Sequence, residues 1–166
     1  MERAGVISKV TESTPWCSGM VVVPKQSGTV RICVDLKDLN ESMLRETHPF
    51  LGVDDILAQL LGATVFSKVD ANSGFWQIPL SEDSCLLTSF ITPYGIYRFN
   101  KLPFGISSAP ELFQSRMNKI LEGLQGVVCH MDDVLINGAN KAEQKSSTTS
   151  IVLKSFSFPA TQVRPL

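Results

Sequence analysis

Two adjacent carboxylates interrupt an apolar run in the stretch Val127-Val128-Cys129-His130-Met131-Asp132-Asp133-Val134-Leu135-Ile136. The β-branched residues on both sides predict two strands, 127–131 and 134–136, joined by a tight turn at the acidic pair. Like charges at neighbouring positions repel, and partial burial between apolar strands adds to that cost. The simplest interpretation is an ordinary Asp-rich turn. A metal site at this turn would need a third carboxylate from elsewhere in the fold.

A third carboxylate, Asp70, ends another predicted strand. Residues 64–70 are rich in β-branched and aromatic side chains, and turn residues follow them. If this strand lies beside the 127–136 hairpin, Asp70, Asp132 and Asp133 offer the oxygen ligands that Mg²⁺ prefers. Two such ions, about 4 Å apart, activate a 3′-hydroxyl and stabilise the leaving pyrophosphate during an in-line displacement. The sequence therefore allows a two-metal site, with Mn²⁺ as a substitute for Mg²⁺.

The rest of the sequence predicts strands and helices without an internal repeat. A capping box at 108–111 precedes Phe113 and Met117, which recur at helical spacing. After Glu143 no acidic residue remains, and a Ser/Thr run predicts a poorly ordered tail over 144–166. The other predicted elements are a hairpin over 21–34, a short helix over 35–43, a helix over 54–61, a hairpin over 86–99 and a Pro/Gly loop over 102–107.

Composition bounds the class of protein. The 166 residues include 15 Lys and Arg against 16 Asp and Glu, which argues against a self-sufficient nucleic-acid binder. Residues 51–100 hold five acidic and two basic side chains, so carboxylates gather there. The longest uncharged stretch, 84–97, is too short and too broken to cross a membrane, and the first residues do not resemble a signal peptide. The four cysteines form no CxxC pair and predict buried, reduced thiols in an intracellular protein.

Four motifs, in order along the chain, resemble those of reverse transcriptases. Residues 31–40 resemble the fingers motif, 69–78 the first catalytic motif, and 102–110 the loop beneath the incoming nucleotide. His130-Met131-Asp132-Asp133 resembles the Tyr-Met-Asp-Asp signature, with His in place of the aromatic residue. The resemblance is to the gypsy-type class of LTR retrotransposon polymerases and covers residues 2–143.

The resemblance implies an α+β fold. We expect the fingers and palm of a right-hand polymerase, with an antiparallel palm sheet packed on helices and with the thumb absent. Fingers are expected over about 1–50 and palm over about 51–143, and part of 80–105 is open to either assignment. Residues 144–166 match nothing in the family pattern and are expected to be a disordered, non-family tail.

The resemblance also implies roles at the acidic turn. Asp70 and Asp132 would be catalytic and would be the main ligands of both Mg²⁺ ions, with Asp133 beside them. His130 and Met131 would lie near the primer terminus. Because imidazole is smaller than the usual phenol ring and can carry a charge, His130 would change primer placement or fidelity.

A second group of residues is expected to bind the nucleotide. Arg31 would grip the triphosphate, because a guanidinium binds phosphate oxygens bidentately. Phe75 would lie under the sugar and exclude a 2′-hydroxyl, and the backbone of residues 71–74, from Ala71 on, would donate to phosphate. Phe104 would contact the nascent base pair. The full set of residues assigned to the nucleotide is Lys25, Arg31, Ala71, Phe75, Phe104 and Gly105.

The implied activity is RNA-directed DNA polymerisation, in which deoxynucleotides are added to a primer on an RNA or DNA template. In this family such a segment is part of a larger Pol polyprotein with RNase H and integrase, and it does not act at a membrane. Because no primer grip or thumb is found here, we expect weak activity from this chain alone. Two alternatives stay open: a degenerate or domesticated retroelement remnant that binds nucleic acid weakly, and a structural domain whose Asp pair is a mere turn.

Overall fold

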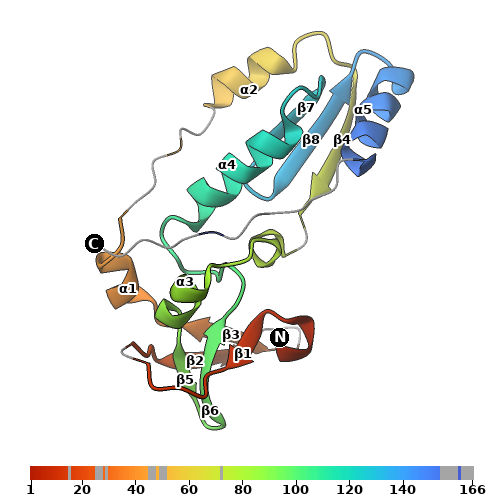
Figure 1. Cartoon of the computed structure of the whole chain (residues 1–166). Helices are drawn as coiled ribbons and strands as arrows, with labels where there is room; N and C mark the ends of the chain where they lie inside the picture. The colour runs from red at the N-terminus through yellow and green to blue at the C-terminus, as the bar shows by residue number, and fades with distance from the viewer. Residues whose placement is uncertain are drawn as a thin grey trace. The chain divides into compact units, whose positions relative to one another are not determined.

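The computed structural model describes residues 1–14, 16–24, 28, 30–44, 48, 52–71, 73–153 and 161. These residues form two units, whose elements are labelled in Figure 1. Unit 1 takes its described residues from 1–45 and 75–109, together with Thr161, and unit 2 from 46–74 and 110–157. The segment 75–109 thus joins the first 45 residues, where the sequence had left part of 80–105 open between fingers and palm.

Unit 1 is built from two small antiparallel sheets and short helices. One sheet has the strand order β1-β6-β5 and the other is the predicted hairpin of β2 and β3. Phe90 and Phe99, with ring centroids 5.2 Å apart, lie in the core. The elements are β1 (Ile7–Lys9), β2 (Met20–Pro24), β3 (Val30–Val34), α1 (Lys37–Glu41), α3 (Glu82–Leu87), β5 (Phe90–Thr92) and β6 (Gly95–Phe99), and two short 3-10 helices are η1 (Glu2–Ala4) and η2 (Gly74–Gln77), whose first residue belongs to unit 2.

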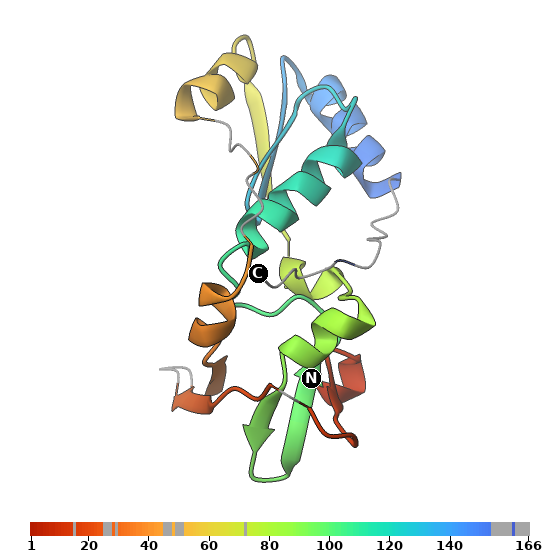
Figure 2. The same cartoon turned by 60° about the vertical axis from the view of Figure 1, so that its left-hand side comes forward.

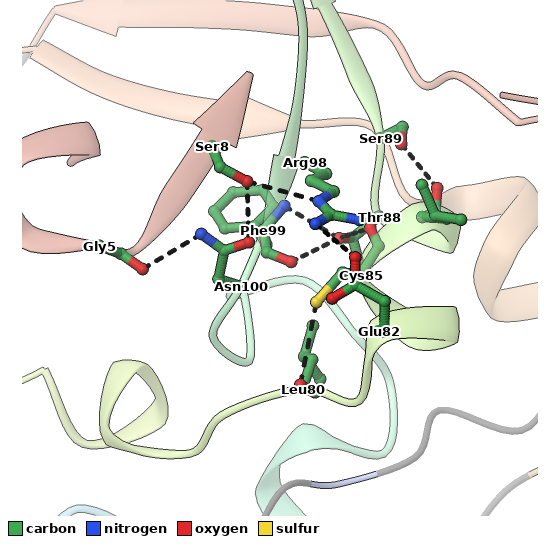
Figure 3. A network of polar contacts seen from close by, with 11 residues as sticks. Gly5, Ser8, Leu80, Glu82, Cys85, Thr88, Ser89, Arg98, Phe99 and Asn100 are labelled. Atoms are coloured by element: carbon green, nitrogen blue, oxygen red, sulfur yellow. Dashed lines mark hydrogen bonds and ion pairs between the residues drawn. The ribbon is translucent and has the colours of Figure 1, made fainter. Parts of the chain in front are cut away.

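A buried polar network ties α3 to the sheet (Figure 3). Thr88, which is fully buried, donates to the carbonyl of Cys85 at 2.7 Å and accepts the N–H of Phe99 at 3.1 Å. Arg98 forms an ion pair of 2.6 Å with Glu82. The prediction of a strand from residue 86 is wrong at its start, because the acidic first turn of α3 favours a helix there and the strand begins only at Phe90.

Unit 2 is a three-stranded antiparallel sheet with helices. The strand order is β4-β8-β7, so the strand that ends at Asp70 lies beside the 127–136 hairpin, as the metal-site hypothesis requires. Figure 2 shows the strands nearly edge on, with α4 and α5 on one side of them. The elements are α2 (Val53–Gln59), β4 (Val65–Asp70), α4 (Ala109–Leu121), β7 (Val127–His130), β8 (Asp133–Gly138) and α5 (Lys141–Leu153).

Side chains of β4 alternate between the two faces of this sheet. Ser67 accepts a hydrogen bond of 2.7 Å from Gln144 of α5, so α5 covers the face on which Ser67 lies. Ile136, the partner of Ser67 in β8, is buried on that face. Lys68 and Asp70 are both exposed. The acidic end of β4 is therefore on a face that α5 leaves open.

The expected disordered tail is wrong over residues 144–153, which form most of α5. Asn140 caps this helix by accepting the N–H of Glu143 at 3.0 Å, and the Glu143 carboxylate accepts the N–H of Ala139 in return. The Ser/Thr run is not low-complexity coil, because hydroxyls such as that of Thr148 donate to carbonyls four residues earlier. Further along, Thr161 is buried and pairs with Leu80.

The predicted helix over 54–61 forms as α2, but it ends at Gln59 and none of its residues is buried. Leu57 is 56% exposed, and Leu61, just beyond the helix, is 84% exposed. Its apolar residues therefore do not form a buried stripe within the described part of the chain. None of the described helices is long and apolar enough to cross a membrane.

Candidate active site

Asp70 and Asp133 face each other across the β4–β8 ladder. They are direct partners in the register that begins with Val65 opposite Gly138. Directly opposite residues of an antiparallel pair have Cα atoms about 4.5–5.5 Å apart, with side chains on the same face. Asp132 belongs to the turn before β8, and its carbonyl accepts the N–H of Ala71 at 2.8 Å. The fold thus brings three carboxylates to one end of the sheet.

Their charges act on one another. Burial, followed by the nearby charges of Asp70 and Asp133, raises the pKa of Asp132 above its usual value. The thiol of Cys129 is also affected. Burial, and then the carboxylates of Asp132 and Asp133, raise its pKa to about 11. Repulsion of this kind is characteristic of carboxylates that share a site.

Lys68 contributes a positive charge to this group. Its ammonium lies 2.8 Å from Oδ2 of Asp133, and both side chains are substantially exposed. The hydrogen bond and charge of Asp133 are the main causes that raise the pKa of Lys68, and the charge of Asp70 adds to them. The role of Lys68 was not recognised from the sequence. Its spacing of two residues from Asp70 on a strand nevertheless places both side chains on one face.

The donor set suits a hard divalent cation, because Mg²⁺ favours carboxylate oxygens. As the side chains stand, no three His, Cys, Asp or Glu residues in the described ranges are placed to hold a metal ion together. The carboxylate of Asp133 is paired with Lys68. Asp70, Asp132 and Asp133 therefore suit the ion by the chemistry of their side chains, and their observed positions do not form a metal-binding group.

The backbone of the turn is held by a buried side chain that the sequence did not single out. Met131 has a φ of +53°, a conformation that non-glycine residues adopt rarely. Its N–H donates to Oε1 of Gln114 at 2.7 Å, and Nε2 of Gln114 donates to the carbonyl of Cys129 at 2.8 Å. Gln114 also donates to Asn118, which contacts His48 at 3.0 Å. The signal that could have identified Gln114 was its place next to Phe113, on the buried face of a predicted helix.

Gly74, in the segment 69–78, allows the ring of Phe113 to come close to the backbone. A Cβ atom at this position would lie 2.7 Å from the ring of Phe113, which is fully buried. Real Cβ atoms do not come so close to a ring, so either the ring or the backbone would have to shift. The glycine of the Ser-Gly-Phe-Trp sequence therefore has a packing reason in addition to its turn propensity.

Three of the residues assigned to the nucleotide line one groove of unit 1. The groove has a volume of about 740 Å³ and is lined in part by Arg31, Phe104 and Gly105. Phe75 contacts Phe104, with ring centroids 5.0 Å apart. Asn40 fixes the loop, since its amide donates to the carbonyl of Gly105 at 2.8 Å.

Other predicted residues stand differently. Lys25 lies outside the described residues. The N–H of Ala71 donates to the carbonyl of Asp132 at 2.8 Å, and its role toward phosphate stays a prediction. His130 and Met131 are exposed at the turn. The acidic residues belong to unit 2 and the groove to unit 1.

These motifs and this fold agree with a comparison against protein families. A family model described as "Reverse transcriptase (RNA-dependent DNA polymerase)" matches residues 23–158. The chain therefore belongs to the reverse transcriptase family. The match extends beyond residue 143, so the expectation that 144–166 is a non-family tail is wrong at least as far as residue 158.

Within the family, the chain is similar to Pol polyproteins of gypsy-type LTR retrotransposons, as its motifs indicated. It is 33% identical over 156 residues to the Transposon Tf2-3 polyprotein of Schizosaccharomyces pombe, covering 92% of this chain and 11% of that protein. It is 36% identical over 142 residues to the Retrovirus-related Pol polyprotein from transposon 412 of Drosophila melanogaster, covering 81% and 12%. The chain thus spans 11–12% of the length of these relatives.

Solved structures confirm the α+β polymerase fold. Prototype foamy virus protease-reverse transcriptase matches with a TM-score of 0.78 and 22% identity, over 92% of this chain and 21% of that one. A second foamy viral structure, in complex with an RNA/DNA hybrid, matches with a TM-score of 0.73 and 22% identity, over 90% and 20%. The alternative of a domain from outside the reverse transcriptase family is excluded by the family match over residues 23–158.

Proposed function

We propose that this chain is the fingers and palm of an RNA-directed DNA polymerase that adds deoxynucleotides to a primer 3′-hydroxyl. The observation that carries this proposal is the direct pairing of Asp70 with Asp133 next to the Asp132 turn. The primed RNA or DNA template and the deoxynucleoside triphosphates are its proposed partners. The family match and the foamy viral complex with an RNA/DNA hybrid support that choice.

We propose that Asp70 and Asp132 are the main ligands of two Mg²⁺ ions, with Asp133 as the third. When bound, the ions supply the charge that favours ionisation of the 3′-hydroxyl and offsets the negative charge of the leaving pyrophosphate. The carboxylates hold and space them. Gln114 keeps Asp132 in place through its hydrogen bond to Met131.

The groove residues are proposed to bind the nucleotide. Arg31 neutralises triphosphate oxygens with a forked donor. Phe104 offers an apolar surface to a base, since it is 53% exposed, and Phe75 packs against it. A ring at position 75 leaves little room for a 2′-hydroxyl and thereby selects deoxynucleotides.

A primer-extension assay tests the proposal. We expect the full chain with Mg²⁺ to add a few nucleotides to a primed RNA template and Asp132→Asn to add none. Asp54→Asn, an exposed acid in the first turn of α2, is the matched control and should behave as the wild type. Equal incorporation by wild type and Asp132→Asn would rule out this active site. The competing hypothesis of a degenerate remnant predicts no Mg²⁺-dependent binding of deoxynucleoside triphosphates.

A further inference from the structure

Lys68 is the basic residue of the β4–β8 ladder that lies closest to Asp70, Asp132 and Asp133. It precedes Asp70 by two residues on the same strand, and Asp70 is the ladder partner of Asp133. The two acids and the lysine therefore share one face of the sheet. Their backbone positions are fixed by regular strand pairing, so the 2.8 Å contact between Lys68 and Asp133 connects two ordered strands.

The negative charges at this end of the sheet favour a cation beside them. Three carboxylates, those of Asp70, Asp132 and Asp133, gather at one end of the sheet. One ammonium offsets part of this negative charge. Lys68 reaches only one of the three carboxylates in an ion pair, that of Asp133.

We infer that Lys68 is an internal counter-ion that holds Asp133 in the metal-free chain and that a divalent cation must displace to recruit this third carboxylate. This inference rests on the proposed function, because it concerns the same carboxylates. Lys68 acts through Asp133 and is therefore a positioning residue. Because it competes for Asp133, Lys68 lowers the affinity of the isolated site for divalent cations. The cations then bind most firmly together with triphosphate oxygens, which add ligands of their own.

Mn²⁺ binding to the full chain, followed as the loss of the free Mn²⁺ EPR signal at low ionic strength, tests this inference. We expect Lys68→Met to bind Mn²⁺ about three- to tenfold more tightly than the wild type, because no ammonium then competes with the cation for Asp133. Lys145→Met, which removes an exposed lysine of α5, is the matched control and should bind as the wild type does. The gain in Lys68→Met should shrink in high salt, since the pair is exposed.

A double variant shows whether Lys68 acts through Asp133. Asp133→Asn should weaken Mn²⁺ binding, and adding Lys68→Met to it should restore little, because the carboxylate that Lys68 holds is gone. Thermal unfolding without metal checks that each variant is folded, and Lys68→Gln replaces Lys68→Met if the latter is not. Unchanged or weaker Mn²⁺ binding in both lysine variants, beside measurable binding in the wild type, overturns the inference alone. Absence of Mn²⁺ binding in the wild type and all variants overturns the metal site as well.

Discussion

Oε1 of Gln114 accepts the backbone N–H of Met131 at 2.7 Å, so a buried helix side chain holds the strained residue before Asp132. We expect Gln114→Met, similar in volume and unable to form these bonds, to lower the free energy of unfolding by about 2–3 kcal/mol. The cost arises because the Met131 N–H and the Cys129 carbonyl lose their partner. Urea unfolding measures it. Gln59→Met, at an exposed position of α2, should change stability little, and an equal loss there would contradict the argument.

The ionised carboxylate of Asp132 is expected to lower the stability of the fold. Its pKa is raised in the folded chain, so protonation favours folding, and stability falls as the pH rises from the usual Asp value through the raised one. Asp132→Asn should therefore stabilise the chain at pH 7 by roughly half a kcal/mol, a figure kept small because solvent screens partly exposed charges.

Thermal unfolding from pH 3 to 8 measures this effect. The Asp132→Asn variant should lose the corresponding part of the pH dependence. Asp133→Asn is the contrasting variant, because it removes repulsion and the Lys68 ion pair together and should give no such gain. A lower melting temperature for Asp132→Asn than for wild type would show that burial of the Asp132 charge and its repulsion by Asp70 and Asp133 do not destabilise the fold.

Gly74→Ala should destabilise the chain by about 1–3 kcal/mol, because the added methyl group meets the buried ring of Phe113 at 2.7 Å. Phe113→Leu opens space at the same point, so the double variant should lose less than the sum of the two single losses. Chemical unfolding of the three variants completes this cycle. Strict additivity would mean that the added methyl group does not act through the ring of Phe113.

Thiol reactivity should divide the cysteines into two classes. Cys17 and Cys33 are exposed, whereas Cys85 and Cys129 are buried, which corrects the expectation that all four are buried. With a pKa of about 11, Cys129 at pH 8 is on the order of one part in a thousand thiolate. Burial also raises the pKa of Cys85. A chromogenic disulfide reagent should therefore modify two thiols in the folded chain and all four in denaturant, and rapid modification of four in the folded chain would contradict the burial.

The sequence predicted the fold best where signals were local or where motifs matched a family. The hairpins and the long helix from the capping box were found because strand alternation, turns and caps are read from neighbouring residues. The tail was misjudged because a Ser/Thr run predicts coil. Its hydroxyls bond within α5, and Ile151 is buried.

For the candidate site, the sequence singled out the acidic residues but not the side chains that contact them. Asp70 and Asp132 were identified from a motif, but the register that sets Asp70 opposite Asp133 depends on pairing between distant segments. Gln114 and Lys68 were missed because their partners belong to other elements. The engaged N–H of Ala71 could not be foreseen for the same reason.

The order of the strands along the chain has a consequence for synthesis. β4 pairs with β8, but the segment 75–109, which belongs to unit 1, and all of α4 are made between them. On the ribosome, β4 therefore emerges without a strand partner until β8 follows. Neither unit is a continuous stretch of polypeptide, so an excised unit 2 would need 75–109 replaced by a linker. The carboxylates of Asp70 and Asp133 are thus brought together late, when the second half of the hairpin closes the sheet.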